Sequence, residues 1–351
     1  MTSDRSRSET STAPRSRPGP RRTRCVALAL LAGSACAGAP GVRFDTARSA
    51  LAVRQPALYP ETLEYDAARD TFLVSSMRDG AIYRVDAAGV VTPLVDDARL
   101  CSVLGIALDA ERGRLWAVNS DLGASRRPSA PGPRQLAAVG VYDLASGAPV
   151  AYVDLAPLVS GPHLLNGIAL DAAGNAYVTD SLSPAIYRVD AGGQPSVLIQ
   201  SEQFAGEGIN LNGLVVHPGG YLLVIKKSEG VLFKVPLDRP AAFTRVAIDE
   251  PVFGGDGVIR VGERGLVIVA NQVPGAASNA AFALSSSDGW ASARLDASRP
   301  LGDVYPTTGV VRGGDLYVVY SHLNELIQAP AEQKASLRAE AVIEKIGRVG
   351  P

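Results

Sequence analysis

The feature that most constrains this chain is a unit that recurs six times along it. Each unit opens with a short aliphatic run, in most cases behind a polar residue and Gly, and then passes through a turn into further β-rich runs. The six openings, which are 43, 62, 46, 44 and 52 residues apart, begin at Glu61, Leu104, Asn166, Asn212, Asp256 and Thr308. A period of this length marks a repeated supersecondary unit.

The β-rich runs inside each unit predict strands. A second run follows every opening, at residues 71–74, 115–118, 176–179, 221–225, 265–269 and 316–320. Such runs between Gly, Asp and Asn turns are typical of strands, and one small sheet cannot bury both faces until neighbours stack around it. We therefore expect residues of about 55 to 347 to form an all-β fold, a six-bladed β-propeller. A β-sandwich or two stacked barrels would explain the number of strands but not the repeat.

Charge and composition limit the partners of the chain. A net charge of -1 and an isoelectric point near 6.3 give no electrostatic reason to expect nucleic acid or an acidic membrane surface. We expect a monomer that takes a small-molecule ligand, with a protein partner as the alternative. The long second unit contains residues 122–135, rich in Pro, Ser, Gly and Arg, which predict a surface loop near the mouth of the channel.

The first forty residues predict an export signal. Arg, Ser, Thr and Pro fill most of residues 1–24, an apolar run follows at 26–32, and small residues follow at 33–39. The apolar run is too short to span a membrane, so we expect a periplasmic or secreted protein. Cys36 lies where a bacterial lipoprotein carries its lipid anchor, although Gly33 is a poor match to that signal. Residues 41–54 are either a linker or a closing strand.

The column of opening residues predicts a metal site. Equivalent strand positions in a propeller lie at one height around its axis, so the opening residues should face one another. Two carboxylates and two amides in a dry channel are costly without a cation. Hard oxygen donors select Ca²⁺, which accepts about 6 to 8 oxygens, rather than Zn²⁺. The expected calcium ligands are Glu61, Asn166, Asn212 and Asp256.

A simpler interpretation of the column also exists. Asn-Gly and Asp-Gly are common turn dipeptides, which would recur because the blade recurs. Four polar residues at one repeat position, with Glu61 where no turn requires it, favour the metal site instead.

The chain resembles the superfamily of six-bladed calcium-dependent propellers that includes gluconolactonase, regucalcin, paraoxonase and diisopropylfluorophosphatase. The motifs that carry the resemblance are Tyr59-Pro60-Glu61, residues 166–180, Asn212-Gly213-Leu214 and Gly255-Asp256-Gly257. The resemblance implies that Glu61, Asn166, Asn212 and Asp256 bind a catalytic calcium ion. Two departures concern the substrate: Leu164 stands where sugar-lactone hydrolases carry Arg, and Thr62 stands where Gly is usual.

The resulting hypothesis is a calcium-dependent hydrolase of the lactonase-like type, acting on a small, fairly apolar ester, lactone or phosphotriester. The catalytic candidates are Asp256, Glu61 and His322, while His163 lies near Asn166 and His217 lies in a predicted turn. Asn119, Asp180, Lys226 and Asn271 end or follow second strands, where they line the channel or bond between blades. Two alternatives stay open: a non-catalytic, calcium-stabilised propeller that binds a protein or envelope ligand, and a metal-free propeller like strictosidine synthase.

Overall fold

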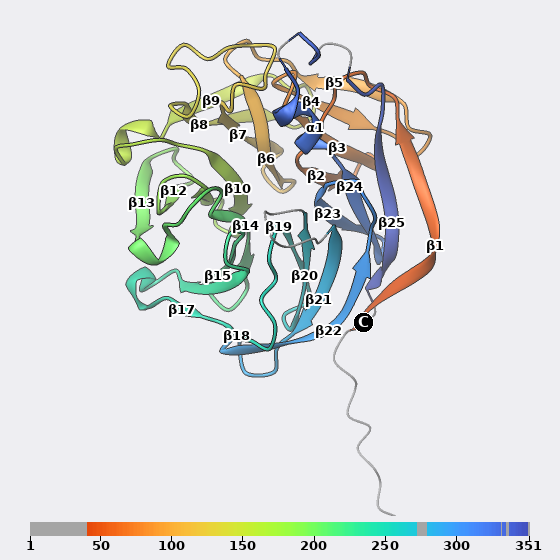
Figure 1. The fold of residues 1–351 in the computed structure, drawn as a ribbon. Helices are drawn as coiled ribbons and strands as arrows, with labels where there is room; N and C mark the ends of the chain where they lie inside the picture. The colour runs from red at the N-terminus through yellow and green to blue at the C-terminus, as the bar shows by residue number, and fades with distance from the viewer. Residues whose placement is uncertain (1–40, 272–278, 331, 335–336, 350–351) are drawn as a thin grey trace, which may run out of the picture. The chain divides into compact units, whose positions relative to one another are not determined.

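The structure, a computed structural model, describes residues 41–271, 279–330, 332–334 and 337–349. In this part of the chain the strands form six separate sheets arranged in a ring, so the prediction of a six-bladed β-propeller is confirmed (Figure 1). The predicted export signal at residues 1–40, Cys36 included, lies outside the described residues. Among the described residues, no helix has the length and apolar character needed to cross a membrane.

Each blade is a small, mainly antiparallel sheet, and in blades 1 to 5 its strands follow one another in the chain. Blades 1 to 3 contain β2 (Leu63–Asp66), β3 (Thr71–Ser76), β4 (Ala81–Val85) and β5 (Val91–Val95); β6 (Ser102–Asp109), β7 (Arg114–Ser120), β8 (Ala137–Asp143) and β9 (Pro149–Asp154); and β10 (Leu165–Leu170), β11 (Ala176–Asp180), β12 (Ala185–Val189) and β13 (Pro195–Gln200). Blades 4 and 5 contain β14 (Leu211–His217), β15 (Tyr221–Lys226), β16 (Val231–Pro236) and β17 (Thr244–Arg245); and β19 (Gly255–Val261), β20 (Gly265–Ala270), β21 (Ala280–Ser285) and β22 (Ser292–Pro300), with β18 (Ala247–Ile248) parallel to β22. Short 3₁₀ helices lie at Ala156–Leu158, Glu202–Phe204 and Pro240–Ala242.

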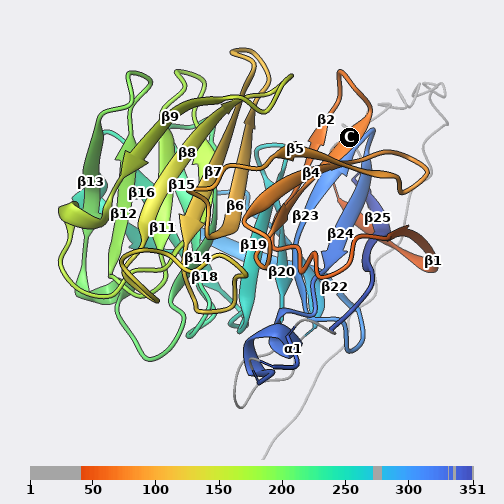
Figure 2. The ribbon, with the colours of Figure 1, turned by 90° about the horizontal axis from the view of Figure 1, so that it is seen from above.

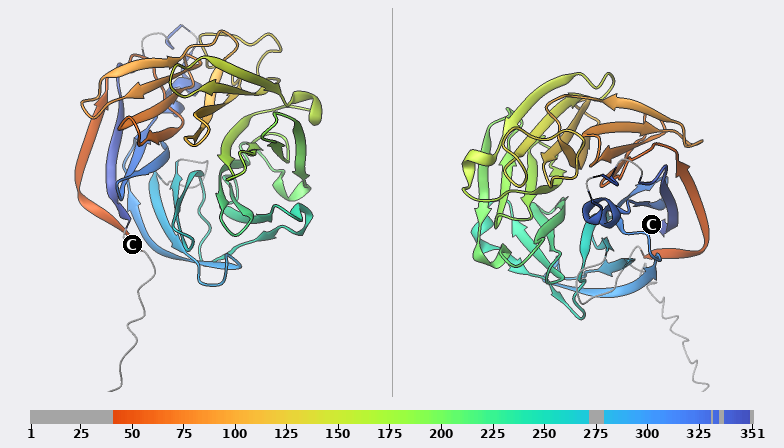
Figure 3. Two further views of the ribbon diagram at one scale, coloured as in Figure 1. Left: turned by 180° about the vertical axis from the view of Figure 1, so that it is seen from behind. Right: turned by 45° about the horizontal axis from the view of Figure 1, so that its top comes forward.

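The two ends of the described chain meet in blade 6. This blade contains β23 (Pro306–Arg312), β24 (Asp315–Tyr320), β25 (Ala341–Val349) and, as its outermost strand, β1 (Val42–Val53). Strand β1 pairs antiparallel with β25, and the two strands lie side by side in Figure 3. Residues 41–54, predicted to be either a linker or a closing strand, therefore supply the outermost strand of the last sheet and close the ring.

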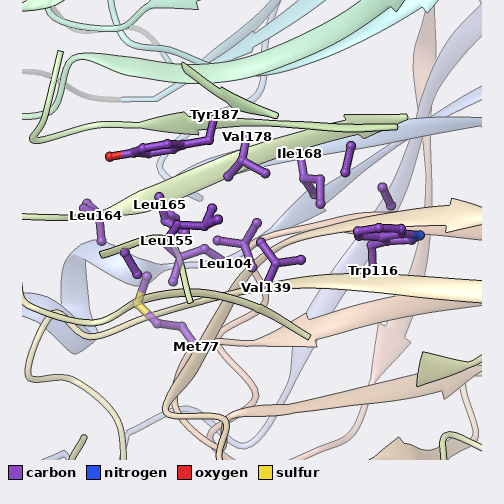
Figure 4. Packing of buried hydrophobic residues seen from close by; sticks show 14 of the residues in the cluster. Met77, Leu104, Trp116, Val139, Leu155, Leu164, Leu165, Ile168, Val178 and Tyr187 are labelled. Carbon is purple, nitrogen blue, oxygen red and sulfur yellow. The ribbon is translucent and has the colours of Figure 1, made fainter. Parts of the chain in front are cut away.

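The first strands of the blades line the centre of the ring. Each of β2, β6, β10, β14, β19 and β23 contacts the first strand of both adjacent blades. Buried apolar side chains fill the space between blades, and Figure 4 shows one such cluster, with Leu104 of blade 2 and Leu165 and Ile168 of blade 3 packed together. Each buried aliphatic side chain of this size stabilises the fold by about 1.5 to 3 kcal/mol, so the blades hold one another in place.

Helix α1 (Leu323–Gln328) lies beyond one end of the ring, as Figure 2 shows. Its buried residues Leu323 and Leu326 belong to the same apolar cluster as Leu122 and Ala124 of the loop between β7 and β8. The predicted surface loop and α1 therefore cover the same end of the propeller.

Candidate functional site

A central cavity with a volume of about 260 Å³ lies between the first strands. It is lined by residues of all six blades, among them the opening residues Glu61, Asn166, Asn212, Asp256 and Thr308. The remaining member of the predicted column, Leu104, is buried in the apolar cluster between blades 2 and 3. The structure thus brings all the polar residues of the column to one cavity.

Bulges in the first strands expose these residues to the channel. The pairing of β10 with β11 skips from Leu165 to Ile168, and that of β14 with β15 skips from Leu211 to Leu214. The same shift occurs in β19, between Gly255 and Val258. A bulge adds a residue that the ladder does not pair and re-aims its side chain. Asn166, Asn212 and Asp256 each lie inside such a bulge.

The glycine after each of these residues allows adjacent blades to approach closely. A Cβ at Gly167 would lie 2.6 Å from the backbone oxygen of Asn212, and a Cβ at Gly213 would lie 2.2 Å from that of Asp256. In blade 1 the hydroxyl of Thr62 instead donates to the backbone oxygen of Leu104, at 2.7 Å. The glycines therefore reflect packing between blades, and the metal prediction depends on the oxygen-bearing side chains alone.

The two carboxyl groups of the cavity interact strongly. Burial, followed by the negative charge of Asp256, raises the pKa of Glu61 well above its usual value. The hydrogen bond from the Thr62 hydroxyl to Glu61 Oε2, at 2.9 Å, and the charge of Lys227 oppose this shift. Burial and the charge of Asp256 therefore favour the protonated form of Glu61, whereas a bound cation would favour the ionised form.

A lysine that the sequence analysis did not single out lies against Asp256. Lys227 Nζ donates to Asp256 Oδ2 at 2.7 Å and to Asn271 Oδ1. Asn271 Nδ2 donates to the same Asp256 oxygen at 2.5 Å and to the backbone oxygen of Pro306 at 2.9 Å. Burial lowers the pKa of Lys227, but the charge of Asp256, its hydrogen bond to Lys227 and the charges of Tyr305 and Glu61 together outweigh burial, so the net shift is upward. Lys227 is thus a buried ammonium group at the site.

The two amides of the cavity keep oxygens free for a ligand. Asn166 donates through Nδ2 to Ser181 Oγ at 3.1 Å, and among the described residues nothing donates to its Oδ1. The Asn212 side chain, in a residue only 3% exposed, has no hydrogen-bond partner within the described residues. Buried polar groups normally find partners. Together with two carboxyl groups, these oxygens fit a calcium ion by their chemistry.

The described residues contain no group of three or more His, Cys, Asp or Glu close enough to hold a metal. The predicted ligand set has only two such residues, and its other two donors are amides. Lys227 and Asn271 both donate to Asp256 Oδ2, and the Asp256 carboxyl also shares a hydrogen bond with Glu61. A cation at this site therefore competes with the ammonium of Lys227.

The three histidines lie away from the cavity lining. His322 caps α1 in a left-handed conformation, with φ of 52°, and its Nδ1 lies 3.4 Å from Glu325 Oε1. Burial, followed by the charge of Arg338, lowers the pKa of His322. His217 Nε2 contacts the backbone oxygen of Glu263 at 2.7 Å, at the end of β14. A catalytic role for His322 thus has no support from its position.

His163 and the polar residues at the ends of second strands have structural partners. His163 Nδ1 lies 2.8 Å from Asp180 Oδ2, and this hydrogen bond raises the pKa of His163. Asn119 accepts from the backbone N–H of Cys101 at 2.8 Å, and Lys226 Nζ donates to the backbone oxygen of Gln203 at 3.1 Å. Four polar residues at the ends of second strands were candidates: Asn119, Asp180, Lys226 and Asn271. Among them, Asn271 forms a hydrogen bond with a predicted calcium ligand, Asp256.

A buried apolar cluster lies next to the opening residues. Tyr59, Met77 and Leu164 belong to the buried cluster that also holds Leu323 and Leu326 of α1. Leu164, which replaces the Arg of sugar-lactone hydrolases, is almost fully buried in this cluster.

The fold and the site define a class: six-bladed propellers with oxygen-bearing side chains around a central cavity. No protein-family model matches the sequence, and no curated protein matches it. Several solved structures match the chain in fold. The Malassezia sympodialis allergen Mala s 1 aligns with a TM-score of 0.66 at 20% identity over 85% of this chain and 95% of its own. A gluconolactonase from Xanthomonas campestris aligns with a TM-score of 0.58 at 14% identity, over 88% and 94%.

A luciferin-regenerating enzyme aligns with a TM-score of 0.58 at 13% identity, over 87% of this chain and 98% of its own. At these identities the likeness concerns the fold. It confirms the resemblance to gluconolactonase-like propellers at that level.

Proposed function

We propose that the protein is a calcium-dependent hydrolase of the lactonase-like type, acting on a small, fairly apolar ester, lactone or phosphotriester. The observation that carries the proposal is that Glu61, Asn166, Asn212 and Asp256, from four blades, line one central cavity. The gluconolactonase among the structural neighbours supports the reaction class by analogy of fold.

The residues of the central cavity would have the following roles in the proposed hydrolysis. The four oxygen-bearing side chains hold the cation, which when bound supplies the positive charge that polarises a carbonyl or phosphoryl oxygen. In its ionised form the Glu61 carboxylate, which its raised pKa makes a stronger base, can accept a proton from an attacking water. Asp256 Oδ2 already accepts from Lys227 and Asn271, so Glu61 is the better candidate for this role.

The aliphatic part of the cavity lining sets the substrate class. Residues such as Ile106, Ile168 and Leu214 would exclude water from the reacting group, which strengthens the electrostatic interactions within the ring. The same side chains favour a ligand with an apolar body. We therefore expect aryl esters and alkyl-substituted lactones to react better than sugar lactones.

Calorimetric titration of the full chain with calcium, combined with a hydrolysis screen, tests the proposal. Wild type is compared with Asp256→Ala and Asn166→Ala, on lactones and aryl esters, with and without chelator. Asp238→Ala is the matched control, because this carboxylate lies at the surface beside Arg239. We expect the two cavity variants to lose calcium binding and hydrolysis while the control keeps both. Hydrolysis that persists in chelator would overturn the calcium-dependent reaction.

A second candidate function is favoured by Lys227, which already partners Asp256 in the ring. In this case the propeller is non-catalytic, calcium only stabilises it, and the loop at residues 122–135 binds a protein or envelope ligand. Calcium that raises the melting temperature without any hydrolysis in the screen would favour this function over the first.

Export belongs to the proposal as well, since residues 1–40 have the composition of an export signal. Expression of the full chain in a bacterial host, followed by cell fractionation, tests it. A Cys36→Ala variant distinguishes a lipid-anchored protein, which this substitution would release from the membrane fraction, from a cleaved soluble one. Retention of the uncleaved chain in the cytoplasm would contradict export.

A further inference from the structure

The ring of predicted calcium ligands already contains a cation of its own. Lys227 follows the last residue of β15 and is only 5% exposed. Its Nζ lies 2.7 Å from Asp256 Oδ2 and contacts Asn271 Oδ1. Asn271 in turn donates to Asp256, so the three side chains form a closed triangle at the wall of the cavity.

The position of this ammonium conflicts with full occupancy by a metal. Calcium binds its oxygens at about 2.3 to 2.6 Å, so an ion on Asp256 Oδ2 would lie at most about 5 Å from Lys227 Nζ. Two ionised carboxylates already balance the two charges of calcium, and a third positive charge in a buried site is repelled. Either the ion avoids that oxygen or the ammonium leaves it.

A second resting place for the ammonium exists nearby. The ring centroid of Tyr305 lies 5.8 Å from Lys227 Nζ, within the range of a cation–π interaction. Tyr305 belongs to the half-buried apolar residues at the end of the channel. The Tyr305 ring is therefore a further partner for an ammonium that a metal ion displaces from Asp256.

We infer that Lys227 is the resident cation of the ring, which pairs with Asp256 when no metal is bound and which a divalent ion must displace. The inference rests on the proposed calcium site and adds a residue that sets its affinity. Lys227 is a positioning residue for Asp256, and it keeps the metal-free ring stable by balancing the charge of Asp256.

Calorimetric titration of the full chain with calcium, after treatment with chelator, tests this role directly. Lys227→Gln removes the charge but keeps a donor for Asp256 and Asn271, and Lys227→Met removes both. Lys227→Arg keeps the charge. Lys234→Gln is the matched control, because this lysine of β16 donates to the backbone oxygen of Gly289 away from the cavity. The melting temperature of each variant, with and without calcium, shows whether it folds and supplies a second readout.

We expect Lys227→Gln and Lys227→Met to bind calcium at least about tenfold more tightly than wild type. Lys227→Arg and the Lys234→Gln control should bind like wild type. Without calcium, the melting temperature of Lys227→Met should fall by several degrees, and calcium should restore it. This pattern would identify Lys227 as a competitor of the metal.

The other outcomes separate this inference from the proposed function. Equal affinity in wild type and Lys227→Gln would overturn the inference and leave the calcium site standing. Binding in Lys227→Gln but not in wild type would support the inference and overturn calcium-dependent activity of the natural chain. No binding in any variant would overturn both.

Discussion

His163 Nδ1 lies 2.8 Å from Asp180 Oδ2 in the interior of blade 3, three residues before the cavity residue Asn166. The other oxygen of this carboxylate accepts three backbone N–H groups, from Leu164 at 2.9 Å and from Leu182 and Ser183 at 3.0 Å. Asp180 therefore ties the end of β11 to the segment that leads into β10 and fixes the direction from which Asn166 enters the channel.

Asp180→Ala should both destabilise the fold and weaken the calcium site. The substitution leaves His163 and three backbone donors buried without their acceptor, at a cost of about 3 to 5 kcal/mol. Urea denaturation measures this cost, and calorimetry measures calcium affinity. Asp171→Ala, in the β10–β11 turn at the other end of these strands, is the control for loss of a turn carboxylate. Unchanged calcium affinity in a folded Asp180→Ala variant would show that Asp180 does not position Asn166.

Glu64 should make the fold less stable as the pH rises through the acid range. This residue of β2 lines the central cavity, and burial raises the pKa of its carboxyl from 4.5 to about 7. Because the unfolded chain releases this proton first, the free energy of unfolding falls between about pH 4.5 and pH 7 by about 3 kcal/mol. Glu64→Gln removes this pH-dependent loss, so the stability of the variant relative to wild type should increase as the pH rises. Urea denaturation at pH 5 and pH 8 measures the difference in the free energy of unfolding between Glu64→Gln and wild type. Glu111→Gln, at an exposed residue, is the control. The same difference at both pH values would refute the prediction.

Gly213→Ala should be severely destabilising although Ala is a small residue. The new Cβ would lie 2.2 Å from the backbone oxygen of Asp256 and 2.9 Å from the backbone N of Val258, so blades 4 and 5 must move apart. We expect a loss of about 3 kcal/mol or more, measured by thermal or urea denaturation. Gly192→Ala is the matched control, because its Cβ meets only the Asp190 side chain, at 3.3 Å. A Gly213→Ala variant as stable as this control would mean that the blades are not so closely packed.

The repeat made the fold predictable, because strand runs and openings recur at a blade-like period whatever their exact side chains. The same repeat placed Glu61, Asn166, Asn212 and Asp256 at one height, and the structure has them on one cavity. The period could not reveal that the Gly after Asn166, Asn212 and Asp256 serves contact between blades, since that needs the neighbouring backbone in place.

The positions of the Lys227 and His322 side chains could not be predicted from the repeat. Lys227 follows Lys226, and only the turn after β15 determines that one lysine bonds the backbone near Gln203 while the next reaches Asp256. The sequence analysis considered the first lysine and missed the second. His322 follows a strand whose end faces the channel, but its left-handed backbone starts α1 and turns the imidazole toward Glu325. Both outcomes depend on local backbone geometry that a repeat does not encode.

Thr62→Val should weaken the contact between blades 1 and 2 and leave Glu61 with fewer partners. The hydroxyl lies 2.7 Å from the Leu104 backbone oxygen and 2.9 Å from Glu61 Oε2, and a valine of similar shape offers neither a donor nor an acceptor. We expect a loss of about 1 to 2 kcal/mol in urea denaturation, whereas Thr62→Ser, which keeps the hydroxyl, should stay within about 0.5 kcal/mol of wild type. Because the Thr62 hydrogen bond lowers the pKa of Glu61, its removal should also strengthen proton competition with calcium. Calcium affinity in Thr62→Val should therefore fall more steeply than in Thr62→Ser between pH 8 and pH 6, and equal slopes would show that the hydroxyl serves packing alone.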